Sequence, residues 1–483
     1  MFIPLMKSSL ILFSLLALVF TTEAELSCSV APLVQRLNSR ISNSAIKKSE
    51  LGLLAVLHQE GKTIRLLEHN HQRPFIPASL TKILTAAMSL EKYPPGHKFF
   101  TQLFSVALQE GKSLKGDIYF KGGGDPSFVS ESMWRLVNEF YRTNIKTIEG
   151  DIVVDASRFD NKGFDSGRDP SRVDRAYDAP VGAMSFNWNS INIYIRPGSK
   201  PGGSAQVFAD PSNNYITLIN KVVTGKKGSH KRLKVSRKNK GAQSEILIVN
   251  GTIPQGGKEV VIYKGILQPD IWSGYHLRAF LQRRGITVTG IIRTGATPPQ
   301  ARLLAQTESK PISQIVFDMM KFSNNYVAEM LTKNLAAEQI GEPGTMANGL
   351  KVLSNYLVEK GFKAKNMRLT SPSGLSRKNR LTPAQLHRVL EDLYKNFTLF
   401  SEFISSLPIS GIDGTLKSRM KEAPVKGWVR AKTGMLKGVS GLAGYAGCSN
   451  GGRVTFVFLF NGRSSKTFAA RHLFDQLAIE LVQ

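Results

Sequence analysis

Residues 77–82 read PASLTK and open a segment whose apolar residues recur at helical spacing. A spacing of three puts the Ser79 hydroxyl and the Lys82 amine on the same helix face, about one turn apart. A serine beside an amine is the arrangement of a nucleophile with its general base. SxxK strings also arise by chance, and residues 44–47 and 418–421 supply two more. Alone, this motif is therefore weak evidence for catalysis.

Two more polar strings follow far downstream, SNN at residues 323–325 and KTG at residues 432–434. Residues two apart on a helix diverge by about 200°, so Ser323 and Asn325 can face one site only if the chain breaks into a loop there. The KTG string lies in a strand-like run, where alternate side chains face one way and glycine lets a ligand lie against the backbone. An ordinary exposed lysine is the alternative for Lys432. The order of the three motifs, at a helix start, a loop and a strand, favours one catalytic site.

The two ends of the chain predict a single α/β domain. A hairpin is expected over residues 51–67 and a helix over 79–93. The C-terminal end reads as three strands, around Val429 and over 441–448 and 453–460, followed by a helix over 465–482. An opening hairpin and closing strands that share one sheet, covered by helices, would make one domain interrupted by a long excursion.

The excursion covers about residues 99–302. Short β-like runs such as DIVVD, INIYI and EILIV alternate there with Gly, Pro, Asn and Asp, which predicts β-rich inserted material. Helical texture returns from Pro311. With 483 residues, more than one domain is expected.

The three ordered motifs resemble the penicillin-recognising serine acyltransferases. The long separation of Ser79 from Ser323 is similar to that in the class C low-molecular-mass penicillin-binding proteins, the D-alanyl-D-alanine carboxypeptidase/endopeptidase family. Compact β-lactamases have a much shorter separation. Further segments resemble the same family: GGGDPSF at 122–128, GDIVVDASRF at 150–159, APVGAMSFNWN at 179–189, SGLSRKNRLTP at 373–383 and GIDGTLKSRM at 411–420.

The resemblance implies an α/β fold of the penicillin-binding-protein and β-lactamase type, an antiparallel sheet flanked by helices, interrupted by two inserted β-rich domains. Its expected boundaries are a signal peptide at 1–24, a catalytic domain at 25–98 and 304–483, an inserted domain II at 99–198 and 263–303, and an inserted domain III at 199–262.

The resemblance also implies roles for the motif residues. Ser79 would attack the carbonyl between two D-alanines, and Lys82 would take its proton. Ser323 would relay a proton to the leaving amine, and Asn325 would hold the peptide amide and the Lys82 amine. Lys432 and Thr433 would bind the terminal carboxylate beside Gly434, and the backbone N–H groups of Ser79 and Met435 would form the oxyanion hole. Met435 departs from the Thr or Ser common in the family, and Ser371-Pro372 departs from the usual Asp-Gly.

A side-chain subsite is implied as well, formed by Asp155, Phe159, Arg377 and Lys437. It would receive the diaminopimelate end of the stem peptide, with Asp155 on the ammonium and the two cations on the carboxylate. For Asp155 the alternative is an acid at a strand-end turn. The implied partners are peptidoglycan stem peptides and cross-links, with β-lactam antibiotics as covalent inhibitors and with no cofactor or metal.

The N-terminal segment predicts export to the periplasm. Lys7 precedes an apolar run from Leu10 to Phe20, which is too short to span a bilayer and ends before Ala24 as a signal peptide would. Whether Cys28 pairs with Cys448 stays open. The eight His residues are scattered without zinc spacing.

The net charge is +28, and basic residues are concentrated between residues 221 and 240, where nine Lys and Arg occur without Asp or Glu. This run predicts electrostatic contact with the wall or the membrane surface, or simply a solvated face. Nucleic acid is disfavoured, because the protein is expected to be exported and the run lacks aromatic residues. Two other functions remain as alternatives to the peptidase: a β-lactamase, or a catalytically inert wall-binding protein.

Overall fold

The computed structural model describes residues 30–164, 178–239, 241, 244–363, 367–448 and 451–482. The expected signal peptide and Cys28 lie outside these residues, so their predictions are not tested. Cys448 is buried, and its Sγ atom donates to the carbonyl oxygen of Leu481 at 3.5 Å. Within the described residues, no helix is long and apolar enough to cross a membrane.

The central sheet joins the two ends of the chain. Its order is β18-β19-β20-β1-β2, and all of its pairs are antiparallel. The strands are β1 (Leu51–Gln59), β2 (Lys62–His69), β18 (Val429–Leu436), β19 (Val439–Gly447) and β20 (Arg453–Asn461). The predicted hairpin and the predicted closing strands therefore share one sheet, as expected from the sequence.

Helices cover both faces of this sheet. Ala443, Tyr445, Val457 and Leu459 pack with the helices of one face, whereas their neighbours Leu442, Ala446, Phe456 and Phe458 pack with those of the other, as the alternation of strand side chains requires. The first face carries α2 (Lys82–Lys92), α5 (Ile312–Lys321), α6 (Asn325–Gln339), α7 (Met346–Glu359), α8 (Pro383–Lys395) and α9 (Phe397–Ser406), and the second carries α1 (Val30–Ser42) and α10 (Thr467–Glu480). Burial on both faces explains why β1, β19 and β20 read as continuous apolar runs.

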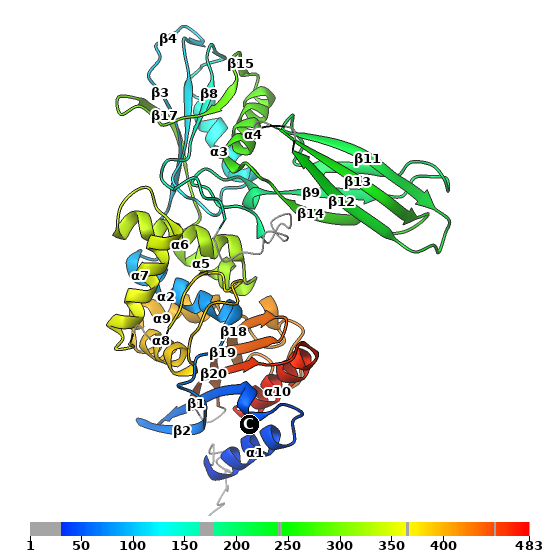
Figure 1. Cartoon of the computed structure of the whole chain (residues 1–483). Coiled ribbons are helices and arrows are strands. Elements are labelled where there is room, and N and C mark those ends of the chain that lie inside the picture. The colour runs from blue at the N-terminus through cyan, green and yellow to red at the C-terminus, as the bar shows by residue number, and fades with distance from the viewer. Residues whose placement is uncertain are drawn as a thin grey trace, which may run out of the picture.

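The excursion forms a separate β-rich part. In Figure 1 the blue, yellow and red ends of the chain lie together, and the cyan and green middle of the chain stands apart from them. Its sheets have the orders β16-β8-β6-β3-β17, β15-β7-β5-β4, β10-β9-β14 and β11-β13-β12. The bounds are β3 (Phe100–Ser105), β4 (Gln109–Glu110), β5 (Ser113–Leu114), β6 (Ile118–Gly122), β7 (Thr147–Ile148), β8 (Ile152–Asp155), β9 (Ser190–Arg196), β10 (Gln206–Asp210), β11 (Ile216–Gly225), β12 (Arg232–Asn239), β13 (Glu245–Pro254), β14 (Val260–Gly265), β15 (Thr287–Val288), β16 (Ile292–Thr294) and β17 (Arg302–Glu308).

Two helices in the excursion were not predicted, α3 (Ser130–Tyr141) and α4 (Pro269–Arg283). Helix α3 buries Met133, Leu136, Val137 and Phe140, a spacing of three and four that would have revealed it. The predicted α/β architecture with inserted β-rich material is confirmed. The exact domain boundaries stay a prediction.

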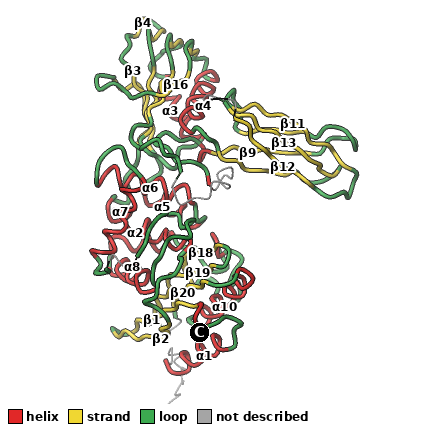
Figure 2. Tube along the Cα trace, viewed as in Figure 1, coloured by secondary structure: helices red, strands yellow, loops and turns green. Residues whose placement is uncertain are grey.

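The strands β9 to β14 form an arm that projects sideways from the β-rich part. Figure 2 shows it as yellow strands joined by green loops, whereas the red helices lie in the rest of the molecule. The basic run lies on this arm, along β11 and β12 and the turn between them. Lys226, Lys227, Lys231 and Arg232 are exposed there.

Candidate active site

The PASLTK motif forms a tight turn that enters α2. A 3₁₀ helix, η2 (Ala78–Thr81), precedes α2, and Ala78 has a φ of 48°, in the left-handed region. Two glycines pack against this turn. A Cβ on Gly374 would lie 1.9 Å from the Ala78 carbonyl oxygen, and one on Gly434 would lie 2.9 Å from the Pro77 carbonyl oxygen. Gly434 of the KTG motif thus lets β18 approach the backbone next to Ser79.

Lys82 connects the first motif to the second. Its Nζ atom lies 3.1 Å from Ser79 Oγ, 2.7 Å from Asn325 Oδ1 and 2.5 Å from the carbonyl oxygen of Ser373. The side chain of Lys82 is completely buried. Burial and then the charge of Lys432 hold the pKa of Lys82 well below its usual value, and Glu329 partly opposes this. This lowered pKa favours the neutral form of the amine beside the serine hydroxyl.

The second motif lies in the loop predicted from its spacing. Helix α5 ends at Lys321 and α6 begins at Asn325. Between them Ser323 has a φ of 55°, which turns the chain so that both motif side chains reach the same site. Asn324 faces elsewhere and caps α6, because its side chain accepts from the backbone N–H of Val327 at 3.2 Å.

Lys432 brings the third motif to the second. Its Nζ atom donates to Ser323 Oγ at 2.8 Å and to the carbonyl oxygen of Thr433 at 2.8 Å. Lys432 is fully buried, and this burial lowers its pKa to about 7. Hydrogen bonds thus join Ser79, Lys82 and Asn325 in one group and Ser323 and Lys432 in a second, and the charge of Lys432 acts on Lys82 between them.

Strand β18 presents its outer backbone edge beside this cluster. It is the terminal strand of the sheet. The carbonyl oxygen of Val429 accepts from Ser410 N and the N–H of Ala431 donates to Pro408 O, each at 2.9 Å, on the side away from β19. Because these groups alternate along a strand, the backbone groups of Thr433 and Met435 point in the same outward direction. The Met435 side chain is half exposed at this edge.

Three contributing residues were not predicted. The Ser373 carbonyl oxygen accepts from Lys82, and Thr415 Oγ1 accepts from Thr433 Oγ1 at 2.9 Å. Asn379 holds the turn before Ser373. Its Oδ1 accepts from the backbone N–H of Thr370 at 2.8 Å, and its Nδ2 donates to the carbonyl oxygen of Ser371 at 2.7 Å. These residues lie in the family-like segments 373–383 and 411–420. Their roles were missed because a backbone carbonyl or a turn does not require a characteristic side chain.

The four residues of the predicted side-chain subsite form two pairs. Asp155 and Phe159 are both buried and line a cavity of about 730 Å³ in the β-rich part. Arg377 and Lys437 are exposed near the β18–β19 turn, where an Arg377 nitrogen donates to the Lys437 carbonyl oxygen at 2.8 Å. In the described part of the chain, no hydrogen bond or ion pair connects the two pairs.

Both oxygens of Asp155 already have protein donors. The Oδ1 atom accepts from the N–H of Ser157 at 3.0 Å, and Oδ2 accepts from the N–H of Thr297 at 2.8 Å. Burial disfavours the charged carboxylate, but these hydrogen bonds prevail and lower the pKa of Asp155. Asp155 therefore stabilises the turn at the end of its strand, as the alternative interpretation of the sequence expected.

The described residues contain no group of three His, Cys, Asp or Glu side chains that could hold a metal ion. The site brings together a serine hydroxyl, two buried amines, an amide and the outer edge of a terminal strand. Such a set suits acyl transfer to serine with lysine as the base.

Comparisons with known proteins cover nearly the whole chain. The model of the D-Ala-D-Ala carboxypeptidase 3 (S13) family matches residues 33–481. A D-alanyl-D-alanine carboxypeptidase from an Actinomadura species is 28% identical over 457 residues, which are 92% of this chain and 83% of the relative. The crystal structure of penicillin binding protein 4 (dacB) from Haemophilus influenzae has a TM-score of 0.78 at 26% identity, covering 93% of this chain and 97% of that chain. The same protein complexed with a novel β-lactam has a TM-score of 0.73 at 25% identity, covering 92% and 97%.

Proposed function

Because the chain belongs to the D-Ala-D-Ala carboxypeptidase 3 (S13) family and is a serine-type DD-carboxypeptidase, we propose that Ser79 is its nucleophile and Lys82 the general base. One observation carries this proposal: the buried Lys82 amine, with its lowered pKa, lies 3.1 Å from Ser79 Oγ. A neutral amine at that distance has a lone pair for the serine proton.

The reaction follows from the neighbouring groups. Ser79 Oγ attacks the carbonyl carbon of the penultimate D-alanine while its proton moves to Lys82. The negative charge on the carbonyl oxygen is stabilised by the backbone N–H groups of Ser79 and Met435. The proton then passes through Ser323 to the leaving amine, the C–N bond breaks, and the ester on Ser79 remains. Water attacks this ester, which frees the shortened peptide and returns the proton to Ser79.

Substrate orientation falls to the third motif. Lys432 and Thr433 would hold the terminal carboxylate, and Asn325 would hold the peptide amide. The peptide would extend along the outer edge of β18 beside Thr433 and Met435 and pair with their outward backbone groups.

We extend the proposal to cross-links, because the bond from D-alanine to the side-chain amine of diaminopimelate is an amide of the same kind. The enzyme would then act as an endopeptidase as well as a carboxypeptidase, and β-lactams would acylate Ser79. Asp155 and Phe159 on one side, and Arg377 and Lys437 on the other, are proposed to recognise the diaminopimelate end of the stem peptide.

The setting is proposed to be the periplasm, after removal of residues 1–24. The arm carries exposed Lys226, Lys227, Lys231 and Arg232, and it is proposed to attract the anionic wall or membrane surface. The strands β10 to β13 of the arm fall within the proposed domain III, residues 199–262, whereas the active-site motifs belong to the proposed catalytic domain.

Incubation with purified muropeptides tests this function. A DD-peptidase releases D-alanine and converts cross-linked dimers to monomers, a β-lactamase turns over only the antibiotic, and an inert binder retains muropeptides uncleaved. Intact mass and peptide mapping should place one β-lactam adduct per chain on Ser79. An undiminished adduct on Ser79→Ala would reject Ser79 as the nucleophile.

The role of Lys82 has a matched control on the same helix. Lys82→Ala should lose acylation, because the base is removed; since Lys82 is one of the largest fully buried side chains, Lys82→Met, which keeps most of that volume, should fold and lose acylation as well. Lys92→Ala changes an exposed lysine of α2 and should acylate like the unmodified enzyme.

A further inference from the structure

A groove of about 700 Å³ lies beside the loop that carries Ser323. Its walls come from the β-rich part, at residues 126–131 and 187–188, and from α5 and the following loop, at residues 310–327. Phe322 and Asn324 line the groove, while Ser323 between them belongs to the active site. The active site and the groove are therefore the two sides of one short loop.

Two exposed aromatic rings flank this groove. Phe322 is 70% exposed and Trp188 is 47% exposed. Buried Ile315 and Val327 lie among its other lining residues. Large rings left in water next to an active site suit a ligand that presents an apolar face.

The backbone at Trp188 is held in an unfavourable conformation. Asn187, Trp188 and Asn189 have φ values of 50°, 53° and 50°. Asparagine tolerates this left-handed region, but a bulky residue such as tryptophan rarely adopts it. Strain of this kind persists where the surroundings enforce it and is concentrated at functional sites.

The two asparagines enforce this turn. Asn187 accepts from the backbone N–H of Ser130 at 3.2 Å and donates to its hydroxyl at 3.2 Å. Asn189 accepts from the N–H of Phe186 at 3.1 Å and donates to the carbonyl oxygen of Pro180 at 2.9 Å. The turn is thus fixed from both sides, and it keeps the Trp188 ring at the surface.

The polar lining of the groove suits hydroxyl and acetamido groups. Ser127, Ser130 and Asn187 contribute hydroxyls and an amide, and Lys310 forms an ion pair with Asp318 at 2.8 Å. Glu131 adds one exposed carboxylate to the lining, which does not suit a strongly anionic ligand and leaves a neutral one as the better match. Aromatic rings that stack on an apolar face, with neutral hydrogen-bonding groups around them, match the surface of a pyranose sugar.

We propose that this groove binds an N-acetylated sugar of the glycan strand to which the substrate's stem peptide is attached. The proposal rests on the proposed DD-peptidase function and adds a second contact for the same substrate. A few peptide residues separate the sugar from the scissile bond, and in extended form they span on the order of 10 Å. That length allows the sugar to lie on the far side of the Ser323 loop while the peptide occupies the β18 edge.

The test compares two substrates that differ only in the sugar: a disaccharide pentapeptide and the same pentapeptide without sugar. Trp188→Asn removes the ring and keeps a residue that tolerates the left-handed backbone, and Trp188→Phe keeps an aromatic ring. We expect Trp188→Asn to lower kcat/KM about tenfold for the glycosylated substrate, as loss of a stacking contact predicts. The sugar-free peptide should change less than twofold, and Trp188→Phe should retain most of the activity on both.

Phe322→Ala should lower kcat/KM for the glycosylated substrate more than for the sugar-free peptide, as Trp188→Asn should, and each of these two variants has a matched control. Phe468 is 71% exposed on α10 and Trp134 is 42% exposed on α3, and both lie outside the groove. Phe468→Ala and Trp134→Asn should leave the ratio of the two substrates unchanged. The disaccharide alone should also shift the tryptophan fluorescence of the Ser79→Ala protein, but not that of the Ser79→Ala, Trp188→Phe double variant.

Equal losses on both substrates, or no loss on either, would overturn the sugar assignment. A loss confined to sugar-free cross-linked peptide dimers would overturn it too, in favour of a peptide occupant. If the unmodified enzyme cleaves neither substrate, the DD-peptidase function itself fails, and the fluorescence measurement still decides whether the groove binds the sugar.

Discussion

The Nζ atom of Lys432 lies 2.8 Å from the Oγ atom of Ser323, so the edge strand of the sheet and the loop between α5 and α6 meet at one hydrogen bond. Lys82 approaches from α2, and its amine lies 2.7 Å from Asn325 Oδ1. Both lysines are fully buried, and burial lowers the pKa of each. The charge of Lys432 lowers the pKa of Lys82 further, and Lys82 lies next to Ser79, whose hydroxyl is proposed to lose its proton.

The lowered pKa of Lys432, about 7, predicts an alkaline limb in the pH profile. If protonated Lys432 holds the terminal carboxylate, kcat/KM of the free enzyme should fall about tenfold per pH unit above that pKa. Lys432→Arg keeps the charge at all accessible pH values, so its profile should lack this limb even if its activity is lower. A limb that is unchanged in Lys432→Arg would contradict the assignment. The measurement is kcat/KM between pH 5 and 10 with a peptide that ends in D-Ala-D-Ala.

The Asp155 proposal predicts a difference between substrates. If Asp155 reads the diaminopimelate ammonium, Asp155→Ala should lower kcat/KM for diaminopimelate peptides by about tenfold more than for a generic diacyl D-Ala-D-Ala substrate. Asp155 could instead have a structural role, because its carboxylate also accepts hydrogen bonds from Ser157 N and Thr297 N. Equal losses on both substrates, with a lowered Tm, would show that Asp155 supports the loop after β8.

Acid should destabilise the protein through buried neutral histidines. Burial lowers the pKa of His276 to about 3, and its ring packs against a tilted Phe186 ring and against Trp272 in an edge-on contact. Because the unfolded chain takes up this proton near pH 6.5, the free energy of unfolding should fall by about 1.4 kcal/mol per pH unit between pH 6.5 and 3 for such a group. The free energy of unfolding can be measured by denaturant titration at several pH values. It should change less steeply with pH in His276→Phe than in the control His230→Ala, which changes an exposed residue. Identical slopes would contradict the prediction.

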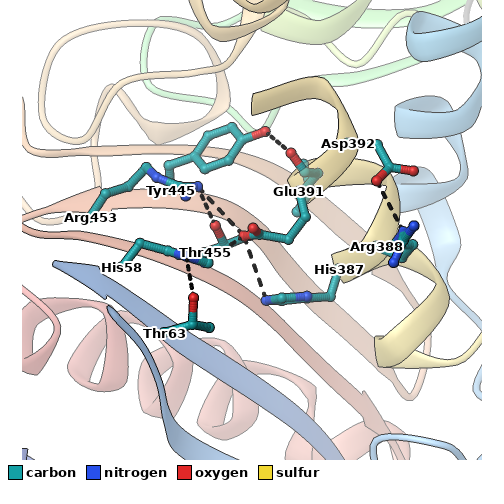
Figure 3. A network of polar contacts seen from close by, with 10 residues as sticks. His58, Thr63, His387, Arg388, Glu391, Asp392, Tyr445, Arg453 and Thr455 are labelled. Atoms are coloured by element: carbon teal, nitrogen blue, oxygen red, sulfur yellow. Dashed lines mark hydrogen bonds and ion pairs between the residues drawn. The ribbon is translucent and has the colours of Figure 1, made fainter. Parts of the chain in front are cut away.

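His387 is a second acid-sensitive group, and it lies where α8 contacts the sheet. Figure 3 shows His387 and Glu391 of α8 facing His58 of β1 and Arg453 of β20. Glu391 Oε1 lies 2.9 Å from His58 Nε2 and 3.5 Å from an Arg453 nitrogen. Burial lowers the pKa of His387 to about 4, so its contribution has the same sign as that of His276 and is lost between about pH 6.5 and 4.

Short-range patterns were sufficient for much of the fold and the site. The hairpin, the helix after PASLTK and the break at Ser323 follow from local spacing, and the three motifs identify the five residues around Lys82 and Lys432. Local sequence patterns did not predict two kinds of feature. The carbonyl oxygen of Ser373 acts through the backbone, which every residue has, and the two pairs of the side-chain subsite depend on how the inserted part packs, which no local pattern encodes.

The basic arm is expected to bind anionic surfaces in a salt-dependent way. Its cations Lys226, Lys227, Lys231 and Arg232 are exposed, so their attraction to an anionic surface should be screened within about 8 Å at physiological ionic strength. Replacing all four by Gln should weaken sedimentation with purified sacculi or anionic vesicles at low salt, and the difference should vanish as salt rises. The control replaces four exposed lysines of the catalytic part, Lys62, Lys92, Lys395 and Lys421, which lowers the net charge equally. If both variants lose binding to the same extent, total charge rather than the arm is responsible. Binding that does not change across the salt series would mean that the arm is simply a solvated face.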